Sequence, residues 1–284
     1  MRTLVRRFQR EVKDESKVTW RSVMTNSQTT SMSVIAVSRF QEFRLVCRRL
    51  VSSPSISKVL EVGCGTGHWL SILSDLPIEL TGVDPSRAML EKARRRVARA
   101  QLVCASAENI PFPGGSFDLI FCVNAFHHFS DPKKFLRDSR LLLRNGGQLA
   151  IFGLDPHAPN TDWYLYDYFP GVRGADLKRY LPVAEVKRLM AEAGFSNPFA
   201  QPAEHIQKTF TGEAVFQDPF LVRESTSQLL LISEDVYLKG KRAITSAVQK
   251  AKRQKRSIFF RVDLTLFMTV GEANGRRWAL GRSE

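Results

Sequence analysis

The sequence predicts an α/β protein with a doubly wound parallel sheet and an antiparallel strand near the carboxyl end. From Lys58 onward, short apolar runs alternate with helical stretches, as expected when parallel strands are joined by crossover helices. A glycine-rich turn follows the first run, and residues 258–270 alternate apolar and polar side chains, the period of a half-exposed strand. The 284 residues suit one enlarged domain or two modest ones.

Each apolar run of four to eight residues is interpreted as a buried strand. The expected strands are Lys58–Val62, Glu79–Asp84, Gln101–Ala105, Phe117–Asn124 and Gly147–Leu154. The expected helices are Gly67–Leu76, Ser86–Arg99, Pro132–Leu143 and Val183–Ala193. Because such strands are apolar on both faces, helices should cover both sides of the sheet.

The two ends of the chain depart from this alternation. Residues 1–55 combine an arginine-rich start with a Ser/Thr-rich stretch, which predicts a partly disordered arm leading into a helix at Ser38–Leu50. The main domain is expected over 56–284. Its parts are a core at 58–155, a helical lid at 156–181 and a carboxyl-terminal part at 182–284, with helices at Glu213–Leu221 and Glu234–Arg253 before the last strand.

Composition narrows the class of protein. Apolar residues make up 43% and charged residues 25%, which is typical of a globular chain. No apolar run approaches the length of a membrane span, so we expect no integral membrane association. The four cysteines form no C-x-x-C pair, which indicates neither a disulfide framework nor a zinc site. A cytoplasmic location and no bound metal are therefore expected.

The formal net charge of +14 raises the question of an anionic partner. Much of the excess lies in Lys92–Arg99 and Lys250–Arg256, and each cluster overlaps a predicted helix. We interpret both clusters as solvated helix faces. Neither contains interleaved aromatic residues, which single-stranded RNA would need for stacking. No specific nucleic acid partner is therefore expected.

The most informative stretch is VLEVGCGTGHWL, residues 59–70. A strand runs into Glu61, and Gly63, Gly65 and Gly67 then form a tight turn whose backbone N–H groups can approach a ligand closely. Asp84 ends the next strand, 17 residues after Gly67. In a βαβ unit this spacing places its carboxylate beside the turn, where it can accept both hydroxyls of a ribose.

A dinucleotide site shares this layout but fits the residues less well. The G-x-G-x-x-G spacing requires a glycine at position 68, where the chain has His68. The carboxylate of Glu61 would repel a pyrophosphate, whereas it suits a ligand that bears an ammonium and a sulfonium. The charge pattern therefore favours S-adenosylmethionine over NAD as the cofactor.

Three stretches together carry a resemblance to a known family. They are E-x-G-x-G-x-G with Asp84, AENIPFPGGSFDLIFCVNAFHHF at 107–129 and LLLRNGGQLAIFG at 141–153. This order resembles the class I S-adenosylmethionine-dependent methyltransferases, which have a Rossmann-like sheet, and in particular the small-molecule group similar to quinone-biosynthesis methyltransferases. The match covers about residues 58 to 155. The resemblance implies a methyltransferase that uses S-adenosyl-L-methionine.

The resemblance also implies roles for the matching residues in holding the cofactor. Glu61 and the Gly63 backbone would hold its methionine end, with Gly65 and Gly67 completing the turn. The remaining contacts would be Asp84 to the ribose, Pro85 and Met89 to the adenine faces, Ser106 and Ala107 to the adenine edge, and Asn124 to the methionine moiety. Ser106 stands where the family usually has a carboxylate, so its hydrogen bond to adenine should be weaker.

Methyl transfer from a sulfonium is an in-line displacement, so the protein chiefly orients the acceptor and removes its proton when one must leave. His127 and His128 follow the fourth strand at the carboxyl edge of the sheet, where ligands bind in such folds. We interpret His128 as the candidate general base. Packing or capping of the next helix is the alternative role.

The acceptor is expected to be a small or medium organic molecule, bound under the segment at 163–180, which holds four of the five tyrosines. A packed helical cap without ligand contact is the alternative for this segment. Two other functions stay open. The basic clusters suggest an RNA methyltransferase, and Ser106 suggests a cofactor-binding scaffold without turnover. The residues carry no signal for the oligomeric state.

Overall fold

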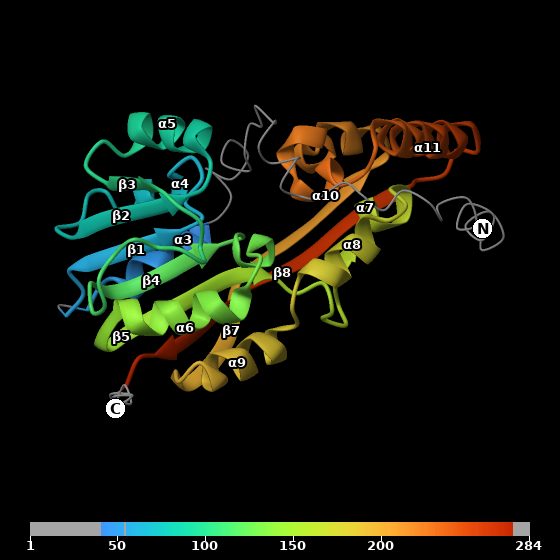
Figure 1. Cartoon of the computed structure of the whole chain (residues 1–284). Helices are drawn as coiled ribbons and strands as arrows, with labels where there is room; N and C mark the ends of the chain where they lie inside the picture. Colours follow the sequence, from blue (N-terminus) through green and yellow to red (C-terminus); the bar gives the residue numbers. More distant parts are fainter. Residues whose placement is uncertain (1–40, 54, 275–284) are drawn as a thin grey trace. The chain divides into compact units, whose positions relative to one another are not determined.

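A computed structural model describes residues 41–53 and 55–274 and shows an α/β protein built on a mixed sheet (Figure 1). Its parallel strands are β1 (Lys58–Val62), β2 (Glu79–Asp84), β3 (Gln101–Cys104), β4 (Phe117–Val123) and β5 (Leu143–Leu154). They lie in the order β3-β2-β1-β4-β5, so the chain reverses direction across the sheet between β3 and β4. The doubly wound sheet expected from the sequence is confirmed.

The sheet continues with antiparallel strands. The last strand, β8 (Phe259–Glu272), pairs with β5 from Gln148↔Glu272 to Leu154↔Leu266, which confirms the antiparallel carboxyl-terminal strand. Two further strands, β6 (Asp162–Trp163) and β7 (Ser196–Thr211), also pair with β8.

The sequence analysis did not predict β7, which contains Pro198 and Pro202. Proline lacks the N–H that a central strand donates to its neighbour, so its presence argues against a strand in general. Within the described part of the chain β7 pairs with β8 alone. An edge strand has one side free of ladder hydrogen bonds, and prolines are tolerated there.

Helices cover both faces of the parallel sheet. On one face, α6 (Pro132–Leu142) and α9 (Val183–Glu192) bury their apolar residues in a core with Leu60, Ile120 and Ile151. On the other face, Leu70 of α4 (His68–Ile72) lies against Gly82, where a Cβ would come within 2.8 Å of it. The remaining helices of this part are α3 (Gln41–Leu50) and α5 (Arg87–Arg96).

Two predicted helices differ from the structure. The helix expected at Gly67–Leu76 is only α4, because Gly67 lies outside it in a left-handed conformation and the chain turns after Ile72. The helix expected at Glu213–Leu221 is a series of 3-10 turns, η3 (Gly212–Gln217) and η4 (Pro219–Leu221). Pro219 cannot donate the helical hydrogen bond, and the Asp218 side chain instead caps η4.

The chain divides into two compact units. The first, which we call the sheet unit, contains the described residues of 40–155, 181–204 and 266–284. The second, the helical unit, contains 156–180 and 205–265. Its helices are α7 (Tyr164–Tyr168), α8 (Val172–Arg179), α10 (Ser227–Leu230) and α11 (Glu234–Arg253). The predicted arm, except for α3 and the loop after it, lies outside the described residues.

The aromatic residues of the expected lid form the interior of the helical unit. Trp163, Tyr164 and Phe169 are each at most 3% exposed. The Tyr164 hydroxyl donates to Asp218 Oδ2 over 2.8 Å, and the Tyr166 hydroxyl donates to Asp176 Oδ2 over 2.9 Å. These contacts favour a packed helical cap over a set of aromatic side chains free to meet a ligand.

Candidate functional site

The glycine-rich loop passes directly against the end of β4. Gly63, Gly65 and Gly67 have φ angles of 73°, 51° and 71°, in the left-handed region where a Cβ is unfavourable. A Cβ on Gly63 would lie 2.5 Å from the Cβ of Ala125, so no side chain fits at that position. A Cβ on Gly65 would meet nothing within 4 Å. The loop is therefore closed against β4 at Gly63 and open at Gly65.

Asp84, at the end of β2, holds this loop in place. Its Oδ2 accepts a hydrogen bond from the Gly65 amide, and its Oδ1 accepts one from the Ser86 amide, each over 2.8 Å. Burial raises the pKa of Asp84, against the opposing effect of these two amides. Each carboxylate oxygen can accept about two hydrogen bonds, so each retains the capacity to accept one from a ligand hydroxyl.

The loop is also held from α5, by a residue of the first basic cluster. Arg96 donates from one Nη to the Thr66 carbonyl over 3.2 Å and to the Thr66 hydroxyl over 2.7 Å. Arg99 donates to the carbonyls of Leu76 and Ile78. Both arginines are exposed, as expected for a solvated helix face, and they also hydrogen-bond to neighbouring segments. Their acceptors lie in the segments before α4 and before β2.

Glu61 is the most unusual residue at this edge of the sheet. Its side chain is fully buried, and among the described residues neither carboxylate oxygen has a hydrogen-bond partner. Burial raises the pKa of Glu61 well above its usual value, the Leu70 amide lowers it, and the charge of Asp84 raises it further. A buried carboxylate without a partner is costly to the fold. A positively charged donor beside Gly63 would supply the missing hydrogen bonds.

The other predicted cofactor residues lie just after the ends of β2 and β3. The Ala105 amide donates to the Asp84 carbonyl over 3.3 Å, and the Cys104 thiol lies 3.6 Å from the Pro85 carbonyl. Ser106 and Ala107 thus come directly after a segment that is hydrogen-bonded to the end of β2. Met89 lies in the first turn of α5, where its amide donates to the Ser86 hydroxyl.

Asn124 and His128 follow β4. Asn124 has a φ of 48°, a left-handed conformation that asparagine adopts more readily than most residues, and its amide donates to the Phe152 carbonyl. His128 ends a 3-10 turn, η2 (Phe126–His128), with its amide bonded to the Ala125 carbonyl. Its ring centroid is 3.9 Å from that of His127. Because Ala125 contacts Gly63, the histidine turn begins directly at the glycine-rich loop.

These residues fit S-adenosylmethionine. The unpartnered carboxylate of Glu61 suits an ammonium, and Asp84 retains acceptor capacity for ribose hydroxyls. Gly65 has no side chain, and the space where a Cβ would lie is open, which leaves room for the ligand there. The sequence analysis missed Arg96, because its link to Thr66 joins residues 30 positions apart and follows no local pattern.

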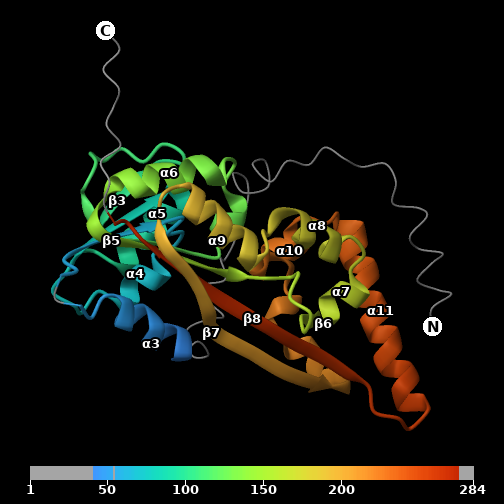
Figure 2. The same cartoon turned by 90° about the horizontal axis from the view of Figure 1, so that it is seen from below.

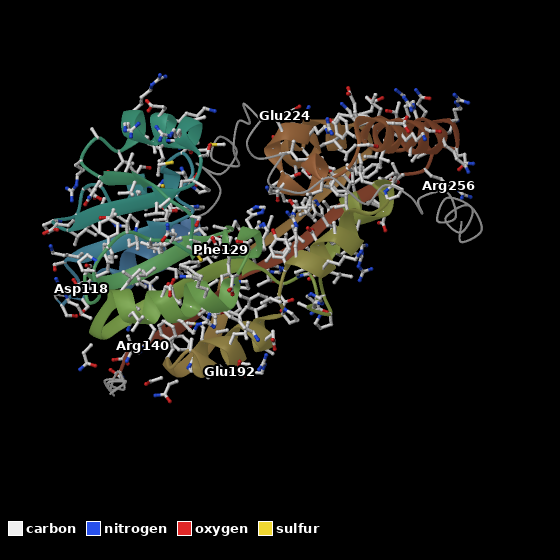
Figure 3. All side chains as sticks on the ribbon, viewed as in Figure 1. Asp118, Phe129, Arg140, Glu192, Glu224 and Arg256 are labelled. Atoms are coloured by element: carbon white, nitrogen blue, oxygen red, sulfur yellow. The ribbon has the colours of Figure 1, made fainter. Side chains whose placement is uncertain are left out.

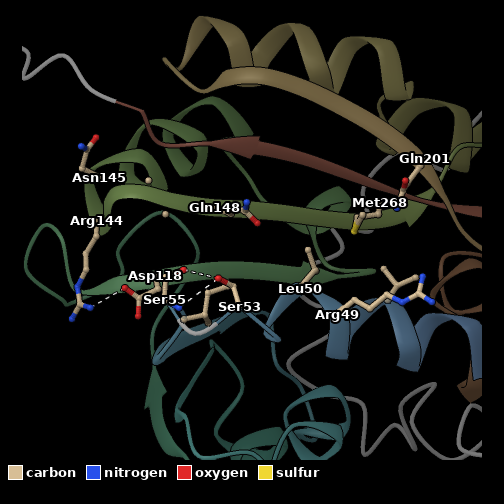
Figure 4. A pocket seen from close by; sticks show the side chains of 14 residues that line it. Arg49, Leu50, Ser53, Ser55, Asp118, Arg144, Asn145, Gln148, Gln201 and Met268 are labelled. Carbon is tan, nitrogen blue, oxygen red and sulfur yellow. Dashed lines mark hydrogen bonds and ion pairs between the residues drawn. The ribbon is translucent and has the colours of Figure 1, made fainter.

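A cavity of about 420 Å³ lies away from these residues, beneath α3 (Figure 4). Its polar end is formed by Asp118 and Arg144, which lie where β4 and β5 begin, at the opposite edge of the sheet from Gly63. The two side chains form an ion pair of 2.8 Å, drawn in Figure 4. This cavity therefore does not belong to the candidate site.

Within residues 41–53 and 55–274, no helix is both long and apolar enough to cross a bilayer. The same residues contain no group of three or more His, Cys, Asp or Glu side chains placed to hold a metal ion.

Part of the chain is similar to known methyltransferases. Residues 60–151 match the family model of a methyltransferase domain. The chain is 29% identical over 190 residues to a demethylmenaquinone methyltransferase of Thermotoga maritima. The aligned region covers 59% of this chain and 82% of the relative. The chain is also 36% identical over 114 residues to an uncharacterised methyltransferase of Bacillus subtilis, and this alignment covers 38% of the chain and 45% of the relative.

The fold is also similar to a solved structure described as a methyltransferase of an antibiotic biosynthesis pathway from Anabaena variabilis. The TM-score is 0.64 at 23% sequence identity, over 81% of this chain and 98% of the other. At this identity the likeness concerns the fold. The Rossmann-like sheet expected from the sequence is therefore confirmed.

Proposed function

We propose that the chain is a class I S-adenosylmethionine-dependent methyltransferase that methylates a small or medium organic acceptor. The buried carboxylate of Glu61 beside the glycine-rich loop is the observation that carries the proposal, because it needs a positively charged partner. Similarity to a demethylmenaquinone methyltransferase supports an organic acceptor. The four free cysteines agree with a reducing cytoplasm as the location we propose.

When bound, S-adenosylmethionine supplies an electrophilic methyl group on a sulfonium. Glu61 and the Gly63 backbone bind its ammonium end, and Asp84 accepts hydrogen bonds from the ribose. The other proposed contacts are Pro85 and Met89 on the adenine faces, Ser106 and Ala107 at the adenine edge, and Asn124 beside the methionine moiety. Gly65 leaves open space where the ligand approaches, and Gly67 allows the loop to pack closely against Ala93 of α5. The protein thus orients the donor for an in-line displacement.

Asp84 tests the placement of the ribose. Asp84→Ala removes two charge-assisted hydrogen bonds to the hydroxyls, each worth about 1.5–3 kcal/mol, so affinity for S-adenosylmethionine and its demethylated product should fall at least about tenfold. Calorimetric titration of wild type and variant measures the change. Asp84→Asn is the matched control, because it keeps one acceptor oxygen and should lose less affinity. Equal affinity in all three proteins would exclude Asp84 from the site.

We propose His128 as the general base for acceptors that must lose a proton. It lies at the carboxyl edge of β4, within a turn that starts against the glycine-rich loop. His128→Ala should leave cofactor affinity unchanged and slow methyl transfer about a hundredfold to ten-thousandfold. The readout is single-turnover transfer as a function of pH. A variant with wild-type rates and pH profile would show that His128 only packs or caps.

The acceptor is identified by activity on a metabolite panel, with S-adenosylhomocysteine as competitor. Methylation of an organic compound that S-adenosylhomocysteine inhibits supports the proposal. Two other outcomes contradict it. Transfer to RNA alone would favour the RNA methyltransferase, and tight cofactor binding without transfer to any acceptor would favour a scaffold without turnover.

A further inference from the structure

The helical unit carries a positively charged surface that the proposed methyl transfer does not use. From Val236 to Val262 the chain has nine Lys or Arg residues and no Asp or Glu. Ile244 and Val248 of α11 are buried, which turns the basic residues of its second half toward solvent. Figure 2 shows α11 joined by a short turn to the start of β8.

We call this surface the basic tip and define it by six exposed cations and one exposed phenylalanine. The cations are Lys250, Lys252, Arg253, Lys255, Arg256 and Arg261, and the phenylalanine is Phe259. Arg256 is labelled at the end of α11 in Figure 3, among other side chains that end in nitrogen.

Backbone contacts within the helical unit hold the parts of the basic tip together. The Gly212 amide, at the start of η3, donates to the Ile258 carbonyl over 3.0 Å. Lys252 forms an ion pair of 3.4 Å with Glu213 of η3, which leaves the tip with a large net positive charge. The turn itself is closed by hydrogen bonds from the Lys255 amide to the Lys252 carbonyl and from the Arg256 amide to the Ala251 carbonyl.

Two residues of the tip break local structural rules. Lys255 has a φ of 52°, a left-handed conformation after a helix end that usually selects glycine or asparagine. Phe259 is 57% exposed, although its neighbour Phe260 is 1% exposed and belongs to the core. The tip therefore has a charged Lys255 at a position where glycine would be less strained. It also has the large apolar ring of Phe259 exposed to water between Arg256 and Arg261. The alternation of β8 turns Phe259 outward, but it does not require an aromatic residue at that position.

We propose that the basic tip docks the protein peripherally on the surface of an anionic lipid membrane, with Phe259 entering the headgroup region. Lysine and arginine side chains bind an anionic leaflet, and an apolar ring among them partitions into the interface. The cations occupy a helix end and a turn, which present an outward surface rather than a groove that tracks a nucleic acid strand. These features favour a membrane over RNA.

The test is sedimentation of the full-length protein with vesicles of phosphatidylcholine, alone or mixed with phosphatidylglycerol. Binding should require the anionic lipid and weaken as salt is added. Each basic residue near such a surface strengthens partitioning by roughly fivefold, so Lys255→Gln/Arg256→Gln should lower the partition coefficient about 25-fold. Phe259→Ser should lower it by about tenfold without changing the number of charges.

Two control variants distinguish an effect of the basic tip from an effect of net charge or of misfolding. Arg94→Gln/Arg95→Gln removes the same charge from exposed residues of α5 and should bind vesicles as wild type does. Lys255→Arg/Arg256→Lys keeps the charge and should also bind normally. Unchanged affinity for S-adenosylhomocysteine and unchanged melting temperature show that each variant is folded.

Phe259→Trp gives an independent readout. Its emission, measured as the difference from wild type, should shift to shorter wavelength on anionic vesicles, because the ring leaves water. The proposal would be overturned if the α5 control and the tip variant both bound anionic vesicles more weakly than wild type and to the same extent. The absence of an emission shift would also overturn it, as would displacement from vesicles by RNA at physiological salt with affinity that depends on Lys255 and Arg256. The last result would assign the basic tip to nucleic acid.

Discussion

Each edge of the parallel sheet contains a buried carboxylate, and the two carboxylates differ in their hydrogen bonding. Asp118, near the start of β4, is 7% exposed, and Glu61, near the end of β1, is fully buried. Asp118 Oδ2 accepts from the Ser57 amide, the Ser57 hydroxyl and the Lys58 amide, and its Oδ1 accepts from Arg144. Among the described residues, Glu61 has no hydrogen-bond partner on either oxygen.

The pKa values follow this difference. Burial raises the pKa of Asp118, but the hydrogen bonds from Ser57 and Lys58 and the charge of Arg144 outweigh it and hold the pKa below its usual value. For Glu61 burial prevails and the pKa is raised. At the amino edge of the sheet, the hydrogen bonds of Asp118 thus stabilise the fold. The carboxyl edge keeps its carboxylate unsatisfied, at a cost in folding energy that a cationic ligand can offset.

The largest expected effect is on stability at the amino edge. Asp118→Ala leaves two backbone amides and a guanidinium without their acceptor, which should lower the free energy of unfolding by about 3 kcal/mol. Urea denaturation followed by circular dichroism measures the loss. Affinity for S-adenosylhomocysteine at temperatures where the variant is folded should equal that of wild type. If the variant had normal stability, Asp118 would not stabilise the fold. If it bound the cofactor poorly while folded, Asp118 would not differ from Glu61 in its role.

Glu61→Gln should have the opposite profile. The amide cannot pair with an ammonium as a carboxylate does, so affinity for S-adenosylmethionine should fall about 30-fold, equivalent to about 2 kcal/mol. Stability of the ligand-free protein should stay the same or increase, because a buried carboxyl group that is costly to ionise is replaced by a neutral amide. Calorimetric titration and urea denaturation on one preparation measure both quantities. Loss of stability together with unchanged affinity would make Glu61 a structural residue.

The smallest expected effect is a pH dependence that Glu61 contributes. Its folded pKa is raised, so its contribution to stability is fully present below the unfolded pKa of about 4.3 and is lost as pH rises through the folded pKa. Binding an ammonium requires the ionised form. Affinity should therefore fall up to tenfold per unit as pH decreases below the folded pKa of Glu61.

Titration calorimetry across this pH range, in two buffers of different ionisation enthalpy, should detect proton release on binding. Glu61→Gln is the control and should show neither the proton release nor this pH dependence. The same pH profile in wild type and variant would assign the effect to Asp84, whose pKa burial also raises.

The sequence by itself determined the elements whose signals are local. The strands β1 and β2 and the helix α11 have the bounds expected from apolar runs and helical periodicity. The glycines of the loop predicted a tight turn, and all three adopt the left-handed backbone that residues with a Cβ rarely adopt. The order of strands and crossovers then placed Glu61 and Asp84 at the same edge, since the carboxyl ends of parallel strands meet there.

Only the tertiary structure decided which side chains find partners. Arg96 was assigned to solvent from its cluster, yet it holds Thr66, and Asp118 carried no sequence signal although it accepts four hydrogen bonds. The expected lid became the core of the helical unit, because its aromatic residues pack against segments far along the chain, such as Asp218 for Tyr164. Such contacts depend on which distant residues the fold brings within hydrogen-bond reach, and no local periodicity records them.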